Sequence, residues 1–175
     1  MGRDKALLAY GVSNFLDHLI ELLRPRVDPV IAVLGHHVVQ ICTTVAPRAG
    51  LQFVVNADYA SGQLSSLQAG IRALPAEAPA ALVALVDHPA VQPSTLDAVL
   101  ARAGAALVIP CYQGRRGHPV LFSRAILDEI AGLPPAATAK QVVHAHLPEA
   151  VLLEVDDPGV VQDIDTPADY ETLRV

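Results

Sequence analysis

Short apolar runs alternate along this chain with segments in which apolar residues recur at helical spacing. Continuous apolar runs, typical of strands buried on both faces, occupy residues 30–34, 51–55, 80–89, 105–110, 120–122 and 151–155. Helical spacing occurs between them, at residues 13–24, 36–45, 64–74, 94–100, 126–130 and 139–147. This alternation predicts an α/β fold with a doubly wound, mostly parallel sheet, in a single domain over residues 1–175.

Polar residues mark where several of these helices begin. Ser13 is predicted to cap the first helix, and Ser94 with Asp97 three residues later indicates a capping box. Residues 166–169, Thr-Pro-Ala-Asp, combine a capping threonine, a proline at the first position and an acid at the third. They predict a last helix that begins directly after Asp165.

Composition limits the kinds of partner that this chain can have. Hydrophobic residues make up 52% of the chain and charged residues 17%, which is typical of a globular protein. The net charge is −6 and the basic residues are scattered, so no nucleic-acid partner is expected. No apolar stretch is long enough to span a bilayer and no signal peptide is recognised, which predicts a cytoplasmic protein without a membrane partner.

Acidic residues supply the strongest candidate chemistry. Asp87 closes the apolar run at residues 80–89, and in open α/β sheets ligands bind at the carboxyl ends of strands. Asp163 and Asp165 come late in the chain, and two carboxylates at one sheet edge can hold Mg²⁺. The alternatives are that Asp87 caps a turn and that the late acids belong to the turn and cap before the last helix.

Three further groups are candidates for binding an anion. Lys5 can place a point charge on a phosphate, although a lysine in this position is usually solvated. Ser65 and Ser66 lie at a predicted helix start and can donate hydrogen bonds to an anion or a base edge. The glycine-containing basic segment 114–119 can clamp an anionic substrate or can form a hairpin turn.

Five motifs, in order, resemble those of the MobA-like nucleotidyltransferases. Residues 1–5 look like the end of the family's Leu-Ala-Ala-Gly-x-Ser-x-Arg-Met-Gly-x-x-Lys signature, and residues 56–67 resemble its nucleotide-binding segment. Residues 86–89, Val-Asp-His-Pro, resemble its Val-Asp-Gln-Pro, with histidine replacing glutamine. Residues 114–119 resemble its Gly-x-Arg-Gly-His-Pro loop, and residues 163–167 match its closing Asp-Ile-Asp-Thr-Pro.

This resemblance implies a Rossmann-like nucleotidyltransferase fold, closest to the molybdenum cofactor cytidylyltransferases. The implied reaction transfers CMP from CTP to a molybdopterin-type acceptor and releases diphosphate, with a molybdoenzyme or its chaperone as a further partner. The resemblance implies Mg²⁺ at Asp87 and Asp165, with Asp163 as second choice, and Lys5 on the phosphates. It implies nucleotide binding by Asn56, Gly62, Ser65 and Ser66, and acceptor binding by Arg116, Gly117 and His118.

The family's first strand and glycine-rich loop have no counterpart in the sequence. We therefore expect the reading frame to continue upstream of Met1 through roughly 10 to 20 residues that encode a strand and a glycine-rich turn. We expect the chain without them to be less stable and nearly inactive, because the missing strand lies beside the Asp87 strand in the family. The competing hypotheses are a non-catalytic nucleotide-binding or cofactor-handling accessory protein, and an oxidoreductase, which lacks support because no Gly-x-Gly-x-x-Gly is present.

Overall fold

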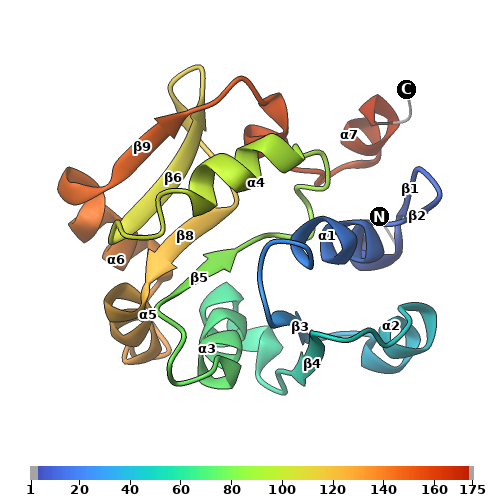
Figure 1. The fold of residues 1–175 in the computed structure, drawn as a ribbon. Coiled ribbons are helices and arrows are strands. Elements are labelled where there is room, and N and C mark those ends of the chain that lie inside the picture. Colours follow the sequence, from blue (N-terminus) through green and yellow to red (C-terminus); the bar gives the residue numbers. More distant parts are fainter. Residues whose placement is uncertain (1–3, 174–175) are drawn as a thin grey trace.

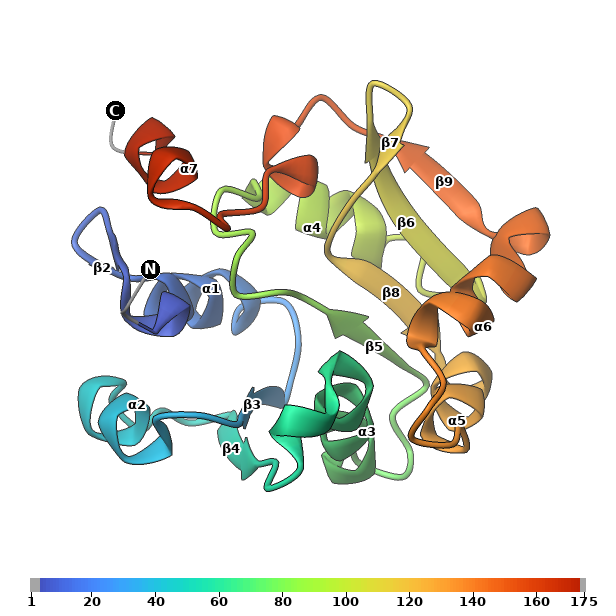
Figure 2. The same ribbon diagram turned by 180° about the vertical axis from the view of Figure 1, so that it is seen from behind.

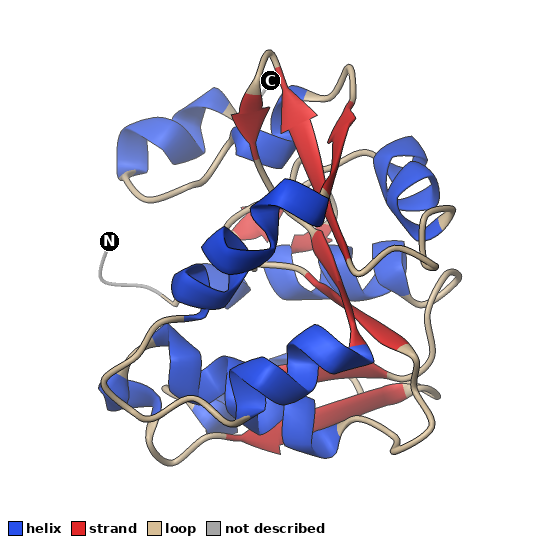
Figure 3. Cartoon of the chain, turned by 90° about the vertical axis from the view of Figure 1, so that its left-hand side faces the viewer, coloured by secondary structure: helices blue, strands red, loops and turns tan. Residues whose placement is uncertain are grey.

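The computed structural model describes residues 4–173 and confirms the α/β class. Figure 1 and the reverse view in Figure 2 show the arrangement of the elements, and Figure 3 shows helices on both sides of the strands. The strands are β1 (Ala9–Tyr10), β2 (Ser13–Asn14), β3 (Val30–Leu34), β4 (Leu51–Val55), β5 (Ala80–Val83), β6 (Leu107–Tyr112), β7 (Arg115–Arg116), β8 (Val120–Ser123) and β9 (Val151–Glu154). The α-helices are α1 (Phe15–Leu23), α2 (Val38–Thr44), α3 (Gln63–Ala73), α4 (Pro93–Leu100), α5 (Arg124–Ala131), α6 (Ala139–His146) and α7 (Pro167–Thr172).

The strands of the described residues form separate sheets. β3 and β4 pair in parallel from Val30–Leu51 to Leu34–Val55. A five-stranded sheet has the order β5-β8-β6-β7, with β9 parallel to β6, and β1 and β2 form a small antiparallel hairpin. β8 is antiparallel to both β5 and β6, so the pairing is mixed instead of mostly parallel.

The strand predicted over residues 80–89 is too long. β5 ends at Val83, and the chain then turns, with the N–H of His88 donating to the carbonyl of Leu85 at 3.1 Å. Residues 84–86 are apolar because they line a cavity and pack against other elements, and not because they pair in a sheet. Asp87 therefore lies in the turn beyond the strand, and not at its last position.

Two predicted helix starts are also corrected. Asn14, and not Ser13, caps α1 by accepting a hydrogen bond from the N–H of Asp17 at 2.8 Å. α4 begins at Pro93, whose lack of an N–H suits a first helical position, so Ser94 is inside the helix and forms no capping box. The predicted cap of α7 is confirmed, because Thr166 and Asp169 form a capping box.

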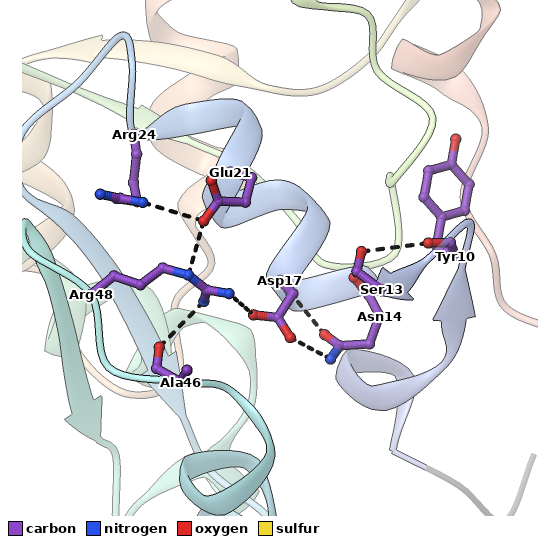
Figure 4. A network of polar contacts seen from close by, with 8 residues as sticks. All are labelled: Tyr10, Ser13, Asn14, Asp17, Glu21, Arg24, Ala46 and Arg48. Carbon is purple, nitrogen blue, oxygen red and sulfur yellow. Dashed lines mark hydrogen bonds and ion pairs between the residues drawn. The ribbon is translucent and has the colours of Figure 1, made fainter.

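Salt bridges hold α1 against the loop that precedes β4. Arg48 contacts Asp17 at 2.6 Å and Glu21 at 2.9 Å, as Figure 4 shows. At the other end of α1, Arg26 forms two hydrogen bonds with Asp97 of α4, at 2.7 and 3.2 Å. α1 therefore connects the β3–β4 unit to the larger sheet.

The hydrophobic core follows the division of the sheets. One large cluster joins β5, β6 and β8 to α3, α5 and α6, and a second joins β3 to α1 and α2. A cavity of about 1130 Å³ lies between them, lined by β3 on one side and β5 on the other. Among the described residues, no helix is both long and apolar enough to cross a membrane.

Candidate active site

Lys5, Asp87 and Asp165 lie together although they come from opposite ends of the chain. Lys5 is in a 3-10 turn at Lys5–Leu7, which Asp4 caps by accepting a hydrogen bond from the N–H of Ala6. The Lys5 Nζ lies 3.6 Å from the Asp87 Oδ2 and forms a hydrogen-bonded ion pair with the Asp165 Oδ1. The structure thus brings together the three residues that the sequence proposes as catalytic.

The backbone positions both acidic segments. The N–H of Ile164 donates to the carbonyl of Asp87 at 2.9 Å, and the Ile164 side chain is fully buried. Because alternate residues of an extended segment point to opposite sides, Asp163 and Asp165 both lie on the exposed side of Ile164. Asp169 accepts hydrogen bonds from the N–H groups of Asp165 and Thr166, which fixes the chain next to the carboxylate.

The pKa values of Asp165 and Lys5 are shifted in the directions that these contacts favour. The hydrogen bond and positive charge of Lys5 lower the pKa of Asp165 below its ordinary value. Partial burial opposes the charged form of Lys5, but the hydrogen bond to Asp165 and the charges of Asp87 and Asp165 outweigh it, and the pKa of Lys5 is raised. Lys5 and Asp165 are therefore charged at neutral pH, and the Lys5 ammonium contacts the carboxylates of both Asp165 and Asp87.

The donor set of this cluster fits a hard divalent cation. Two carboxylates already converge on one positive group, and the Asp87 Oδ1 is buried without a hydrogen-bond partner in the structure. Over residues 4–173 there is no group of three or more histidine, cysteine, aspartate or glutamate side chains that could hold a metal ion. Mg²⁺ suits such a site, because it is usually held by one or two carboxylates, with water and substrate phosphates as its other ligands.

The residues proposed for nucleotide binding also form one network. Asn56, 5% exposed, follows β4 and donates to the hydroxyls of Ser65 and Ser66 at 2.9 and 3.0 Å. The Asn56 Oδ1 accepts from the N–H of Asp58 at 3.0 Å, which shapes the loop before α3. Gly62, with φ of 108°, sits at the start of α3, where this left-handed backbone favours glycine.

The predicted acceptor loop is held close to the segment after β9. The N–H of Gly117 donates to Pro110, and the N–H of His118 donates to the carbonyl of Val160, both at 2.8 Å. A Cβ at Gly117 would overlap the Val160 backbone, so only glycine fits there. Arg116 is exposed, and the loop places it, with Gly117 and His118, on the wall of the large cavity.

His118 lies close to His88, which stands where the similar family motif has glutamine. The rings of His88 and His118 are 5.3 Å apart, and the His88 Nε2 is 4.0 Å from the Asp87 Oδ1. Burial, together with the proximity of His88, lowers the pKa of the His118 imidazole. His118 is therefore neutral at pH 7, and it can accept or donate a hydrogen bond without adding positive charge to the loop.

The nucleotide segment and the acceptor loop open onto the same cavity. Gly62 and Ser66 line it, and so do residues 116–118. Asp4 and Val86, the chain neighbours of Lys5 and Asp87, line it too. The Lys5–Asp87–Asp165 cluster thus lies next to a cavity that both predicted binding segments share.

Sequence reasoning missed the role of Asp157. This side chain is 2% exposed and accepts hydrogen bonds from the N–H of Gln92 at 2.9 Å, the N–H of Gly159 at 2.9 Å and the hydroxyl of Thr95 at 2.6 Å. It holds the segment after β9 against α4. The only signal in the sequence is the Asp-Pro-Gly turn at residues 157–159, which does not reveal burial.

Comparison with known proteins gives matches over nearly the whole chain. Residues 1–151 match the family model described as MobA-like NTP transferase domain. The chain is 24% identical over 174 residues to the molybdenum cofactor cytidylyltransferase of Escherichia coli (strain K12), covering 99% of this chain and 88% of that protein. Among solved structures it is similar to Rv0371c of Mycobacterium tuberculosis H37Rv, with a TM-score of 0.85 at 26% identity over 99% of this chain and 90% of that one. The manganese complex of Rv0371C gives a TM-score of 0.80 at 26% identity over 98% and 92% of the two chains.

Proposed function

Because this chain belongs to the family of the MobA-like NTP transferase domain, we propose that it is a Mg²⁺-dependent nucleotidyltransferase that transfers CMP from CTP to a molybdopterin-type acceptor. The observation that carries the proposal is the convergence of Lys5, Asp87 and Asp165 beside the cavity that the two binding segments share. The cytidylyltransferase of Escherichia coli supplies the choice of CTP and of the acceptor.

The proposed reaction is an in-line displacement at phosphorus. An oxygen of the acceptor's phosphate forms a bond to the α-phosphorus of CTP, while the bond between that phosphorus and the oxygen bridging to the β-phosphate breaks. The electron pair leaves with diphosphate, and the CMP group remains on the acceptor. The protein therefore has to position two phosphorylated molecules and neutralise their charge.

Different residues of the site would bind the metal, the triphosphate and the base of the nucleotide. Asp87 and Asp165 would hold Mg²⁺, which when bound stabilises negative charge on the phosphate oxygens. The Lys5 ammonium would contact the triphosphate, and Gly62 would let the backbone at the start of α3 approach the nucleotide. The network of Asn56, Ser65 and Ser66 would orient its base and ribose.

The acceptor loop would act from its own part of the cavity wall. The Arg116 guanidinium would bind the acceptor's phosphate, and the neutral His118 imidazole would hydrogen-bond to its polar groups. A partner that delivers or receives the cofactor, such as a molybdoenzyme or its chaperone, would approach this same opening.

Calorimetric titration with CTP, GTP and NADH, each with and without Mg²⁺, tests the proposal. Mg²⁺-dependent binding of CTP, followed by release of diphosphate when acceptor is added, is the expected result. Binding of CTP without turnover in any form of the protein would favour the accessory-protein hypothesis. Binding of NADH alone would contradict both and favour an oxidoreductase.

A comparison of Asp163→Asn with Asp165→Asn at limiting Mg²⁺ tests the choice of metal ligand. We expect the Asp165 variant to need more Mg²⁺, because Asp165 shares a cation with Asp87 and is held next to the capped start of α7. The opposite order would assign the metal to Asp163.

A further inference from the structure

His88 and His118 form a largely buried pair of imidazole rings beside the candidate active site. Their ring centroids lie 5.3 Å apart, and the ring planes are tilted by 51°. His88 comes from the turn after β5 and is 9% exposed, whereas His118 comes from the loop before β8. The Nδ1 atoms of both rings are buried and have no hydrogen-bond partner. Two polar groups are thus kept in the interior without the hydrogen bonds that normally accompany burial.

The surroundings of this pair are apolar. Both rings line a cavity of about 10 Å³, and the rest of its lining consists of leucine, valine, alanine and proline residues, including Leu19 of α1 and Leu96 of α4. A cavity of this size has room for one water molecule at most. Because an unpaired buried nitrogen lowers the stability of a fold, an apolar residue at position 88 would occupy the same space at a lower cost.

His88 also lies beside an acid that would hold the proposed metal. The His88 Nε2 is 4.0 Å from the Asp87 Oδ1, which is buried without a hydrogen-bond partner, while the Asp87 Oδ2 faces Lys5. A shift of about 1 Å would bring the Nε2 to hydrogen-bond distance, and such contacts often tighten only when a site is loaded. A hydrogen bond from His88 would fix one oxygen of the carboxylate and leave the other for a cation.

His118 borders both the small cavity and the large one of about 1130 Å³, whereas His88 does not line the large one. The backbone of the acceptor loop is fixed, since the N–H groups of Gly117 and His118 are hydrogen-bonded. The backbone of Val83, at the end of β5, hydrogen-bonds to the His118 ring. His88 can therefore act on the substrates only through its neighbours Asp87 and His118.

We propose that His88 is a positioning residue for nucleotidyl transfer, whose imidazole holds the Asp87 carboxylate and the His118 ring in one fixed arrangement. This role rests on the proposed function, in which Asp87 binds the metal and His118 the acceptor. It accounts for a polar ring that is kept in an apolar place at a cost in stability. The glutamine of the similar family motif can also donate and accept hydrogen bonds, so His88→Gln is the conservative substitution.

Replacing His88 by leucine separates positioning from folding. His88→Leu roughly keeps the size of the side chain and removes both nitrogens, so the melting temperature is expected to rise or stay the same. Calorimetry is expected to show a Mg²⁺-dependent affinity for CTP that is lower by about tenfold or more. His88→Gln is expected to recover most of this loss. His146→Leu, which removes a contact between α6 and Glu129 of α5, is the matched control and is expected to keep the affinity.

A structural role for His88 would give a different result. The affinity for CTP would then fall only together with the melting temperature, and His88→Gln would not restore it. This outcome would overturn the proposal.

Nuclear magnetic resonance of the histidine rings tests the positioning without nucleotide. Asp87→Asn is expected to shift the ring nitrogen signals of His118, because His88 lies next to both residues. In a chain that already carries His88→Leu, the same change is expected to shift the His118 signals by about half as much or less. An undiminished shift would show that His88 does not link the two residues and would overturn the proposal. If no variant and not the original chain binds CTP with Mg²⁺, the proposed function fails, and the ring signals still decide whether His88 holds Asp87 and His118 together.

Discussion

Asp87 carries the greatest weight among single residues, since one of its carboxylate oxygens contacts Lys5 and the other is buried without a hydrogen-bond partner. Replacing it with asparagine removes the charge that a cation needs and keeps the shape of the side chain. We expect Asp87→Asn to weaken Mg²⁺-dependent CTP binding by about tenfold or more, measured by calorimetry. Asp128→Asn, which changes an exposed acid on α5, is the control. Unchanged binding in the Asp87 variant would mean that this acid only shapes its turn.

The ion-pair cluster also makes stability depend on pH in a defined way. The pKa of Asp165 is lowered from 3.8, so its contribution to stability is present above that pH and is lost as the pH falls through the folded-state pKa. The pKa of Lys5 is raised from 10.5, so its contribution is present below that pH and is lost as the pH rises through the folded-state pKa.

The Lys5→Gln variant tests this dependence. The difference in melting temperature between the original chain and Lys5→Gln is expected to be constant between about pH 5 and pH 9 and to shrink below pH 3.8. Thermal melts across this range measure it, with Lys140→Gln, an exposed lysine of α6, as control. A difference that is the same at low pH would show that Lys5 stabilises the fold through packing and not through charge.

At the scale of elements, the acceptor loop depends on one glycine. Gly117 packs against the backbone of Val160, which cannot move as a flexible side chain would. Gly117→Ala is expected to lower the free energy of unfolding by about 1–3 kcal/mol, since a methyl group must be forced into a filled space. Gly104→Ala is the matched control, because a Cβ there meets nothing within 4 Å. Denaturant melts compare the two, and equal stabilities would show that the loop can shift away from Val160.

The sequence predicted the bounds of a strand correctly where the residues of its apolar run all pair in a sheet. β3 and β4 begin and end where their runs do, because each run is bounded by residues that leave the sheet. Residues 84–86 continued the run of β5, but they are apolar for packing and for lining the cavity, and pattern alone does not separate these causes. Asn14 took the cap predicted for Ser13 because asparagine caps a helix as well as serine does. α4 begins at Pro93 instead of Ser94 because proline suits the first helical position.

The sequence likewise predicted only part of the candidate site. The motifs indicated Lys5, Asp87 and Asp165, and the structure places these side chains in contact. Which of the late acids is buried was not predictable, since burial of Asp157 depends on its partners Gln92 and Thr95 on a distant segment. A tertiary contact of this kind leaves no periodic signal in the sequence.

At the scale of the whole molecule, the division of the core predicts unequal local stability. Residues 30–55 contain a two-stranded sheet with its own core cluster, and the cavity lined by β3 and β5 separates it from the sheet centred on β6, which pairs with β7, β8 and β9. We expect amides of residues 30–55 to open with a free energy at least about 1 kcal/mol below that of residues 107–122. Native-state hydrogen exchange in increasing denaturant measures both values.

Arg26 provides a perturbation that tests the same division. Its contacts with Asp97 connect α1 to α4 across the two halves, so Arg26→Met is expected to lower the opening free energy of residues 30–55 and to leave that of residues 107–122 unchanged. Arg124→Met, which removes contacts within the larger half, is the control and is expected to spare residues 30–55. If every region instead opens with one common free energy in all three proteins, the two halves unfold as a single cooperative unit, and the contacts of α1 and α3 are strong enough to join them across the cavity.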